Sequence, residues 1–304
     1  MQGRYTSLVG IVGATALALA VPQLGPLLEP LTAPIVAALV FASIRDFELD
    51  SLRSDARPLA AAFGLTYLVV PALALAFGTL LLDPEPLTGV LVMVAAPSTA
   101  GSAIVWTRLA GGKASLAAII AVVTIALSPV VTPAVLSVVA SFSIELSATA
   151  ILVDLLTIVG GGVALAVVLP DDVPSDRTVR SGSLVAIALL VYVSVATADP
   201  AGSDLATVLP VAVVVAGVVA AVFAGLLLAG RVVDLDRRVV PALLFSATLR
   251  NLGVGLLLAA YVPLSGTVVA VVTYYVVQQL AGALFAGVVF DGRTAHRQSA
   301  DTLP

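Results

Sequence analysis

The sequence contains no cysteine and only one histidine, His296, which lies in a polar C-terminal tail. The absence of cysteine excludes disulfides, thiolate nucleophiles and cysteine-ligated metal sites. A lone histidine in a tail also argues against a histidine-based metalloenzyme, and no cofactor is expected. The net charge of −4 argues against a protein that binds nucleic acid.

Charged residues are also scarce. They make up 11% of the 304 residues, hydrophobic residues make up 60%, and the mean hydropathy is +1.16. A soluble domain contains about 25% charged residues. The composition therefore indicates an all-α polytopic membrane protein whose surroundings are the lipid bilayer, with too little polar sequence for a separate soluble domain.

The apolar sequence divides into runs near the ~20 residues that a helix needs to cross a bilayer. We predict ten transmembrane helices, at 7–28, 31–44, 57–82, 87–109, 115–139, 148–169, 184–197, 208–228, 239–262 and 266–290. With a cytoplasmic N-terminus, every lysine and arginine except Arg250 falls on the cytoplasmic side, and the outer connections carry only acidic charges. Because this asymmetry sets orientation, we expect a prokaryotic plasma-membrane protein with both termini cytoplasmic.

The ten helices divide into two sets of five, at residues 1–145 and 146–304. Because five is odd, the second set must run inverted relative to the first. Asp46 and Asp199, which follow the second and seventh helices, are separated by about the same distance as Pro97 and Arg250. Inverted repeats with interrupted helices at matching positions are typical of secondary transporters.

The first predicted interruption is the sequence Ala-Pro-Ser-Thr-Ala-Gly-Ser at 96–102. Pro97 removes a backbone donor and disfavours helix at the residue before it. Ser98 or Thr99 can cap a second half-helix, and Gly101 adds backbone freedom. The simpler alternative is a proline kink whose neighbouring hydroxyl groups bond to the preceding turn.

The second predicted interruption holds Arg250 beside Asn251 and Gly253, at mid-membrane depth. An arginine at that depth costs at least ~2.5 kcal/mol, so we expect a function for it. Asn251 is the expected cap of the second half-helix. The amide ends of the two second half-helices suit a carboxylate or sulfonate, and the carbonyl ends of the first half-helices suit a cation.

These features predict a secondary transporter whose binding site lies at the two interruptions. Gln278 and Gln279 interrupt the tenth helix and either contact the substrate or join helices by hydrogen bonds. The predicted substrate-binding residues are Pro97, Ser98, Thr99, Gly101, Ser102, Arg250, Asn251, Gln278 and Gln279.

Asp154 is the only other ionisable residue well within a predicted helix. It is an alternative, structural partner for Arg250, and it is also the possible proton group of a proton-coupled carrier. It lies roughly 8 Å from the outer end of its helix, at 1.5 Å per residue. The helices hold no histidine–glutamate, serine–histidine, serine–lysine or paired-aspartate set, so an intramembrane enzyme is not expected. A scaffold or channel would not need two matched interruptions.

The sequence also resembles the bile acid:sodium symporter family over nearly its whole length. The resemblance rests on 39–47 with the pair Asp46-Phe47, Pro71, 96–102, 127–133, 250–253, and Gln278-Gln279 with Gly282. It implies two inverted five-helix repeats arranged as a core and a panel domain, in which helices four and nine are broken and cross. It also implies symport of organic anions with sodium by alternating access.

The sequence departs from the sodium-coupled members of that family where they bind the ion. They carry a glutamate and, four residues later, a glutamine, at the positions of Ser246 and Arg250 here. A glutamine in their third helix matches Thr66. The hydroxyl residues of their fifth helix fall largely on apolar residues here, and Thr124 is the match that keeps a hydroxyl. The predicted ion or ion-surrogate site comprises Thr66, Thr124, Ser246, Thr248 and Arg250.

We therefore predict a secondary active transporter that moves a small organic anion by alternating access, with Arg250 in place of a sodium ion. The alternative is a sodium- or proton-coupled carrier of the same fold, similar to auxin-efflux carriers, with Asp154 as the proton group.

Overall fold

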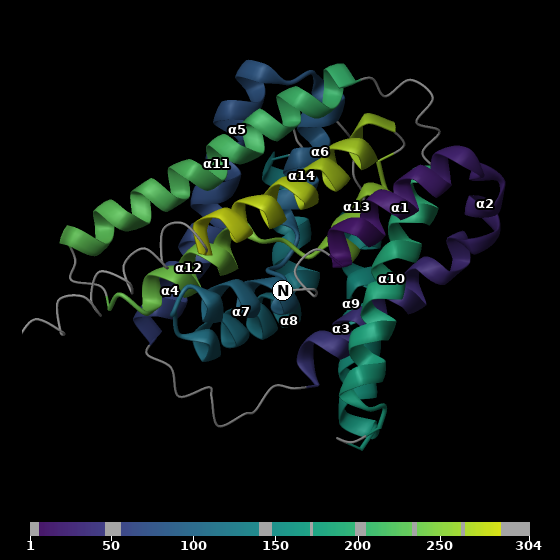
Figure 1. Cartoon of the computed structure of the whole chain (residues 1–304), viewed down its shortest axis with the longest axis horizontal. Helices are drawn as coiled ribbons and strands as arrows, with labels where there is room; N and C mark the ends of the chain where they lie inside the picture. The colour runs from purple at the N-terminus through teal and green to yellow at the C-terminus, as the bar shows by residue number, and fades with distance from the viewer. Residues whose placement is uncertain are drawn as a thin grey trace, which may run out of the picture.

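The computed structural model describes residues 6–45, 56–139, 148–170, 173–197, 205–232, 236–262 and 265–286, and these are helical apart from short connections (Figure 1). Seven helical segments among them are long and apolar enough to cross a membrane. They are Pro22–Ile44, Ala56–Leu81, Ala114–Val138, Thr149–Val168, Asp176–Thr197, Thr207–Gly230 and Gly266–Leu284. The prediction of an all-helical, multi-pass membrane protein is confirmed.

Two of these segments begin earlier than the sequence predicts. The helix expected from residue 31 begins at Pro22, so α1 (Thr6–Ala20) is shorter than the expected 7–28. The helix expected from residue 184 begins at Asp176. In the first case prolines stand at the first positions of successive short turns, where a missing N–H costs little. In the helix that begins at Asp176, the first two turns are polar, so hydropathy alone places the start of this helix too late.

The fourth and ninth predicted helices each consist of two pieces. The fourth is α6 (Pro84–Ala95) followed by α7 (Ala100–Leu109). The ninth is α12 (Val239–Thr248) followed by α13 (Leu252–Ala259). Each piece alone is shorter than the ~20 residues that a bilayer requires.

The helices form two groups. The peripheral group consists of α1, α2 (Gly25–Leu28), α3 (Thr32–Ile44), α9 (Ala148–Val168) and α10 (Asp176–Thr197). The central group consists of α4 (Ala56–Gly64), η5 (Leu65–Val69), α5 (Val70–Leu81), α6, α7, α8 (Ala114–Val139), α11 (Leu205–Val232), α12, α13 and α14 (Ser265–Leu284). The two groups meet where α8 packs against α9. In Figure 1, α1, α2, α3 and α10 of the peripheral group lie on the right, and α5, α11 and α12 of the central group lie on the left. Helix α13 packs against α3 and α10, so one of the interrupted segments lies at the contact between the groups.

Glycine allows close helix packing in each group. A Cβ atom on Gly162 of α9 would lie 2.6 Å from Cγ1 of Val40 in α3. A Cβ atom on Gly89 of α6 would lie 2.5 Å from the carbonyl oxygen of Thr267 in α14. The two groups are therefore held internally by backbone-close contacts, which polar or large side chains at these positions would prevent.

Some sequence features lie outside the described residues. These are Asp46, Asp199, the expected boundary between the halves at 145 and 146, the end of the tenth predicted helix at 287–290, and His296.

Candidate functional site

The chain leaves helical geometry at both predicted interruptions. Ala96, which precedes Pro97, is extended (φ −62°, ψ 150°), as a residue before proline prefers. Leu249 is also extended (φ −93°, ψ 112°). The Asn251 side chain accepts a hydrogen bond from the Val254 amide at 3.2 Å, which confirms it as the cap of α13. At α7 the prediction was wrong, because neither hydroxyl caps the helix and the N-cap residue, Thr99, makes no side-chain cap bond.

The two non-helical segments pair with each other through their backbones. Ser98 and Arg250 form an antiparallel bridge. The Thr99 amide donates to the Leu249 carbonyl at 3.0 Å, and the Asn251 amide donates to the Pro97 carbonyl at 2.9 Å. Unwound backbone within a bilayer must find partners in the protein, and here each segment provides them for the other.

Hydroxyl groups of α8 satisfy further backbone groups of the first segment. The Ser98 amide donates to Oγ1 of Thr124 at 3.2 Å. Oγ1 of Thr132 donates to the Ala95 carbonyl, the last of α6, at 2.9 Å. The Ser98 hydroxyl itself has no partner among the described residues. Thr124, which the sequence predicts for an ion site, therefore helps to fix the backbone of the first interruption.

Both glutamines of α14 form hydrogen bonds within the protein. Oε1 of Gln278 accepts from the Arg250 amide at 2.7 Å, and its Nε2 donates to the Arg250 carbonyl at 3.0 Å. Oε1 of Gln279 accepts from Nε1 of Trp106 at 3.1 Å. This geometry favours the interpretation that the two amides join helices.

The guanidinium of Arg250 is fully buried and bonds to backbone carbonyl groups. Its Nη2 donates to the Thr66 carbonyl at 2.7 Å and its Nη1 to the Ala96 carbonyl at 3.2 Å. The expected alternative, a pair with Asp154, is not formed: that carboxylate is exposed and accepts a hydrogen bond from the Tyr261 hydroxyl. Arg250 therefore lies within reach of carbonyl dipoles instead of a carboxylate.

The Thr66 carbonyl is free to accept because the helix around it is irregular. Residues 65–69 form the π-helical turn η5, in which the Val70 amide bonds to the Leu65 carbonyl five residues earlier. In this register the donor for Thr66 would be residue 71, which is Pro71 and has no N–H. Single π-turns in helices often mark functional sites. Here the turn presents one carbonyl oxygen to the guanidinium.

The Ala96 carbonyl is the second acceptor and lies just beyond the C-terminal end of α6. The C-terminal end of a helix carries a partial negative charge. Helix α12 also ends next to this point, at Thr248. The site therefore offers carbonyl oxygens and helix C-termini to a positive charge, and the guanidinium occupies it.

Sodium is the ion that the resemblance implies, and the residues present do not fit it. Sodium needs several oxygen ligands, and the oxygens of Thr66 and Ala96 already accept from Arg250. The family's glutamate position is Ser246, which is buried with no partner for its hydroxyl among the described residues. Thr248 donates its hydroxyl to the Leu244 carbonyl at 2.7 Å, within its own helix. The described residues contain no cluster of three or more acidic or histidine side chains able to hold a metal.

A cavity of about 240 Å³ lies between the two helix groups. Thr99, Ala100 and Gly101 line it at the start of α7, and Asn251, Leu252 and Gly253 line it at the start of α13. Its other walls are Leu39, Ala42, Ser43, Ile104, Ala118, Ser183, Ile187 and Tyr275. None of these lining residues is charged. Two helix N-termini with their free amides thus meet at one uncharged cavity.

The cavity separates the predicted substrate-binding residues into two sets. Thr99, Gly101 and Asn251 line it. The remaining six do not: Pro97, Ser98, Ser102, Arg250, Gln278 and Gln279. Sequence reasoning missed Ser43, Ser183 and Tyr275; the first two carry no distinguishing pattern, whereas Tyr275 lies one turn before Gln279 on α14.

Comparison with known proteins agrees with the membrane architecture. No curated protein matches the sequence. The model of the SBF-like CPA transporter family (DUF4137) matches residues 7–289, which is nearly the whole chain. This family is related to the sodium bile acid symporters, and its members are transporters and not enzymes. The chain therefore belongs to the SBF-like CPA transporter family, a family of secondary transporters.

Proposed function

We propose that this protein is a secondary active transporter that moves a small organic anion across a prokaryotic plasma membrane without sodium, because Arg250 takes the place of the ion. The observation that carries the proposal is the buried guanidinium bonded to the carbonyl groups of Thr66 and Ala96. A bound sodium ion would bring a positive charge to such oxygens only while bound. The arginine brings it permanently.

In this proposal, α6–α7 and α12–α13 are each one interrupted membrane helix, the fourth and the ninth of ten, and they cross at the bridge between Ser98 and Arg250. The two halves of the chain are inverted repeats, and both termini are cytoplasmic. The peripheral group is the panel domain and the central group is the core domain. The backbone pairing of the two interruptions and their matching positions in the sequence support this arrangement.

The electrostatics of the cavity favour an anion. The free amides at the start of α7 and α13 carry partial positive charge and suit a carboxylate or sulfonate. No acidic side chain lines the cavity to oppose an anion. Arg250 is adjacent in sequence to Asn251, a lining residue, and its charge acts through a protein interior in which Coulomb interactions are stronger than in water.

The position of the cavity supports alternating access. With a cytoplasmic N-terminus, Ser43 of α3 and Ser183 of α10 are near the cytoplasmic ends of their helices, and both line the cavity. At the outer ends, Tyr261 beyond α13 bonds to Asp154 of α9, which links the central to the peripheral group. The proposed state is therefore inward-facing, with the outer side closed.

The second candidate is a proton-coupled carrier of the same fold. The exposed Asp154 carboxylate accepts the hydrogen bond of Tyr261 at a contact between the two groups. Protonation of the carboxylate would weaken this bond, which is the behaviour that a proton-coupled gate requires.

Thermal stability of the purified protein tests the proposal. Wild type, Arg250→Gln and Gly101→Leu are unfolded in sodium and in choline buffers, across a panel of small carboxylates and sulfonates. A ligand that binds only the folded state stabilises it by RT ln(1 + [L]/Kd), or ~2.7 kcal/mol at a hundred times Kd. We expect at least one anion to stabilise wild type equally in both buffers.

Gly101→Leu keeps the test informative if Arg250→Gln does not fold. A Cβ atom on Gly101 meets nothing within 4 Å, so leucine fills the cavity without a backbone clash. Gly160 of α9 has the same open surroundings away from the cavity, so Gly160→Leu is the matched control. The anion should stabilise the control and fail to stabilise Gly101→Leu. Anion stabilisation of wild type that requires sodium would overturn the role given to Arg250, and no response to any anion would overturn the substrate class.

A further inference from the structure

An open groove lies on the surface of the peripheral group, between α3 and α10 and separate from the cavity, with a volume of about 640 Å³. One end is polar, with Arg177, Thr178 and Ser181 of α10. These three side chains are exposed at the first turns of a helix that is a candidate membrane span. The polar end therefore lies at the level of the lipid headgroups.

The other end of the groove is apolar. Val185 and Leu189 of α10 line it, with Ile35 of α3 opposite. Val185 is 67% exposed although it belongs to a candidate membrane span. Arg177, Ser181, Val185 and Leu189 recur every four positions along α10, so they lie on one face of the helix. Along this face, α10 is polar from Arg177 to Ser181 and apolar from Val185 to Leu189.

The length of this face matches one leaflet of a membrane. From Arg177 to Leu189 the helix rises about 18 Å at 1.5 Å per residue. One leaflet contributes about half of the ~30 Å hydrocarbon thickness. A groove that is cationic at the membrane surface and apolar to the depth of one leaflet has the dimensions and polarity of a phospholipid.

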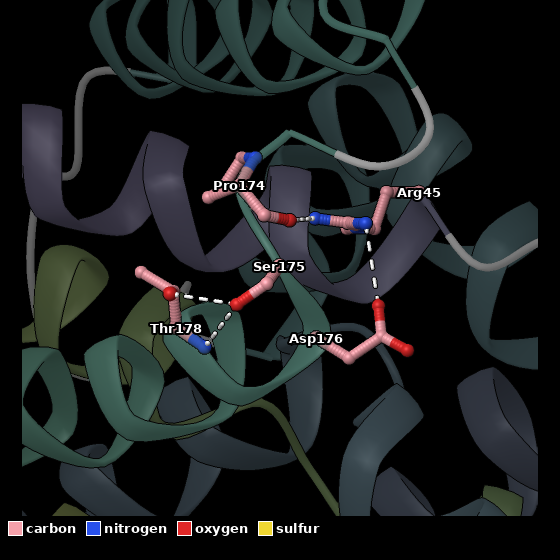
Figure 2. Close-up of polar contacts among 5 residues, drawn as sticks. All are labelled: Arg45, Pro174, Ser175, Asp176 and Thr178. Carbon is pink, nitrogen blue, oxygen red and sulfur yellow. Dashed lines mark hydrogen bonds and ion pairs between the residues drawn. The ribbon is translucent and has the colours of Figure 1, made fainter.

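The hydrogen bonds at this end of α10 leave the charge of Arg177 available. Figure 2 shows Arg45, at the end of α3, donating to the Pro174 carbonyl at 2.5 Å and pairing with Asp176 at 3.4 Å. The acidic neighbour of Arg177 is therefore already paired. Arg177 itself has no ion pair or hydrogen bond with the described part of the chain.

The hydroxyl groups nearby are also held in place. The Ser175 hydroxyl bonds to the Thr178 hydroxyl at 2.9 Å, as Figure 2 shows. Serine at this position caps the helix start. The first turn of α10 therefore presents Arg177 and its neighbouring hydroxyls from an ordered backbone.

We propose that this groove binds an anionic phospholipid of the cytoplasmic leaflet. The phosphate pairs with Arg177 and accepts hydrogen bonds from Thr178 and Ser181. An acyl chain covers Val185 and Leu189 and packs against Ile35. The proposal concerns a surface of the peripheral group and does not depend on the transported substrate.

Native mass spectrometry of the purified full-length protein tests the site. The protein is titrated with phosphatidylglycerol or with phosphatidylcholine of the same acyl chains, and the fraction that carries one bound lipid gives each affinity. Wild type should prefer phosphatidylglycerol. Because one basic residue at a membrane surface contributes ~1 kcal/mol, Arg177→Gln should lower the affinity for phosphatidylglycerol about fivefold.

A second variant tests the groove itself. A Cβ atom on Gly182 meets nothing within 4 Å, so Gly182→Leu fills the groove without disturbing its neighbours and should abolish the first binding event. Arg108→Gln, at the end of α7 and outside the groove, is the charge control and should leave the affinity unchanged. Equal affinity for the two lipids, an unchanged affinity in Gly182→Leu, or an equal loss in Arg177→Gln and Arg108→Gln would each overturn the proposal.

Discussion

The side-chain amide of Gln278 pairs with both backbone polar groups of Arg250. It accepts from the Arg250 amide at 2.7 Å and donates to the Arg250 carbonyl at 3.0 Å. Because Arg250 stands between two helices, neither backbone group has a helical partner. The glutamine therefore replaces the hydrogen bonds that a continuous helix would have supplied, and so fixes the residue whose side chain enters the protein interior.

This pairing predicts a large effect of Gln278→Ala on stability. The substitution leaves a buried amide and a buried carbonyl unpaired, at ~1–3 kcal/mol for each group. We expect a loss of at least ~2 kcal/mol in the free energy of unfolding, measured by denaturation in detergent micelles. Gln279→Ala, which removes one side-chain bond to Trp106, is the matched control. Equal losses for the two alanine variants would contradict this account.

The sequence predicts the location of the interruptions better than the contacts that complete them. Pro97 forces Ala96 out of helical geometry, and Asn251 is a strong capping residue, so both breaks can be placed from local rules. Arg250 stands out because a charge at that depth is costly. The sequence could not predict where the Arg250 side chain points. Its acceptors are backbone carbonyl groups, and every residue has one.

Pro71 is the one sequence feature that could have identified the Thr66 carbonyl as an acceptor. A proline in the interior of a helix removes the donor for a carbonyl four or five residues earlier. Which of the two carbonyls becomes free depends on whether the helix contains a π-turn. The sequence does not encode this in a local pattern, and the structure shows the π-turn at η5.

The role of Pro71 predicts energetic coupling with Arg250. Pro71→Ala supplies an amide that competes for the Thr66 carbonyl, so the guanidinium loses part of its stabilisation. Arg250→Gln should then cost less in the Pro71→Ala background, by about 1.5–3 kcal/mol, the value of a hydrogen bond to a charged group. A double-mutant cycle of unfolding free energies measures this coupling.

Pro129 of α8 provides the control for that cycle. Residue 125 is four positions before it, and the Ile125 carbonyl accepts from the Ser128 hydroxyl at 2.7 Å instead of from Arg250. Pro129→Ala should therefore leave the cost of Arg250→Gln unchanged. Similar coupling in both backgrounds would mean that proline removal acts through general helix stability and not through the Thr66 carbonyl.

The proposed exchange of sodium for arginine predicts that a sodium response can be restored. Ser246 is buried in α12, four residues before Arg250, with no partner for its hydroxyl among the described residues, and it matches the glutamate of the sodium-coupled family. In the double variant Ser246→Glu with Arg250→Gln, the carboxylate and the two freed carbonyl groups offer oxygen ligands to the ion. We expect sodium to raise the melting temperature of the double variant relative to choline, and to leave that of wild type unchanged.

The single variants test separately whether a sodium response requires the carboxylate and whether it requires the freed carbonyl groups. In Ser246→Glu alone, the guanidinium still occupies the carbonyl groups of Thr66 and Ala96, so no sodium response is expected. In Arg250→Gln alone, the carbonyl groups are free but the carboxylate is missing. A sodium response of wild type equal to that of the double variant would contradict the exchange.

The bond between Tyr261 and Asp154 predicts control of access from the outer side. It joins the central group to the peripheral group, and in the proposed orientation it lies on the outer side, so opening that side must break it. The chain has no cysteine, which makes Thr99→Cys a unique reporter inside the cavity. In an otherwise unchanged protein, a membrane-impermeant thiol reagent should label this cysteine in inverted vesicles and only slowly in intact cells. Adding Tyr261→Phe should raise labelling in intact cells about fivefold, the effect of losing ~1 kcal/mol from the closed state.

Asp154→Asn and Tyr192→Phe sharpen this test. An asparagine oxygen still accepts from the Tyr261 hydroxyl, so Asp154→Asn should raise outer labelling less than Tyr261→Phe does. Tyr192 donates to the Val21 carbonyl within the peripheral group, and its removal breaks a tyrosine hydrogen bond that does not join the two groups. Tyr192→Phe should therefore leave outer labelling unchanged. Equal increases for Tyr192→Phe and Tyr261→Phe would show that loss of any tyrosine hydrogen bond destabilises the protein. The bond between Tyr261 and Asp154 would then have no specific role in outer access.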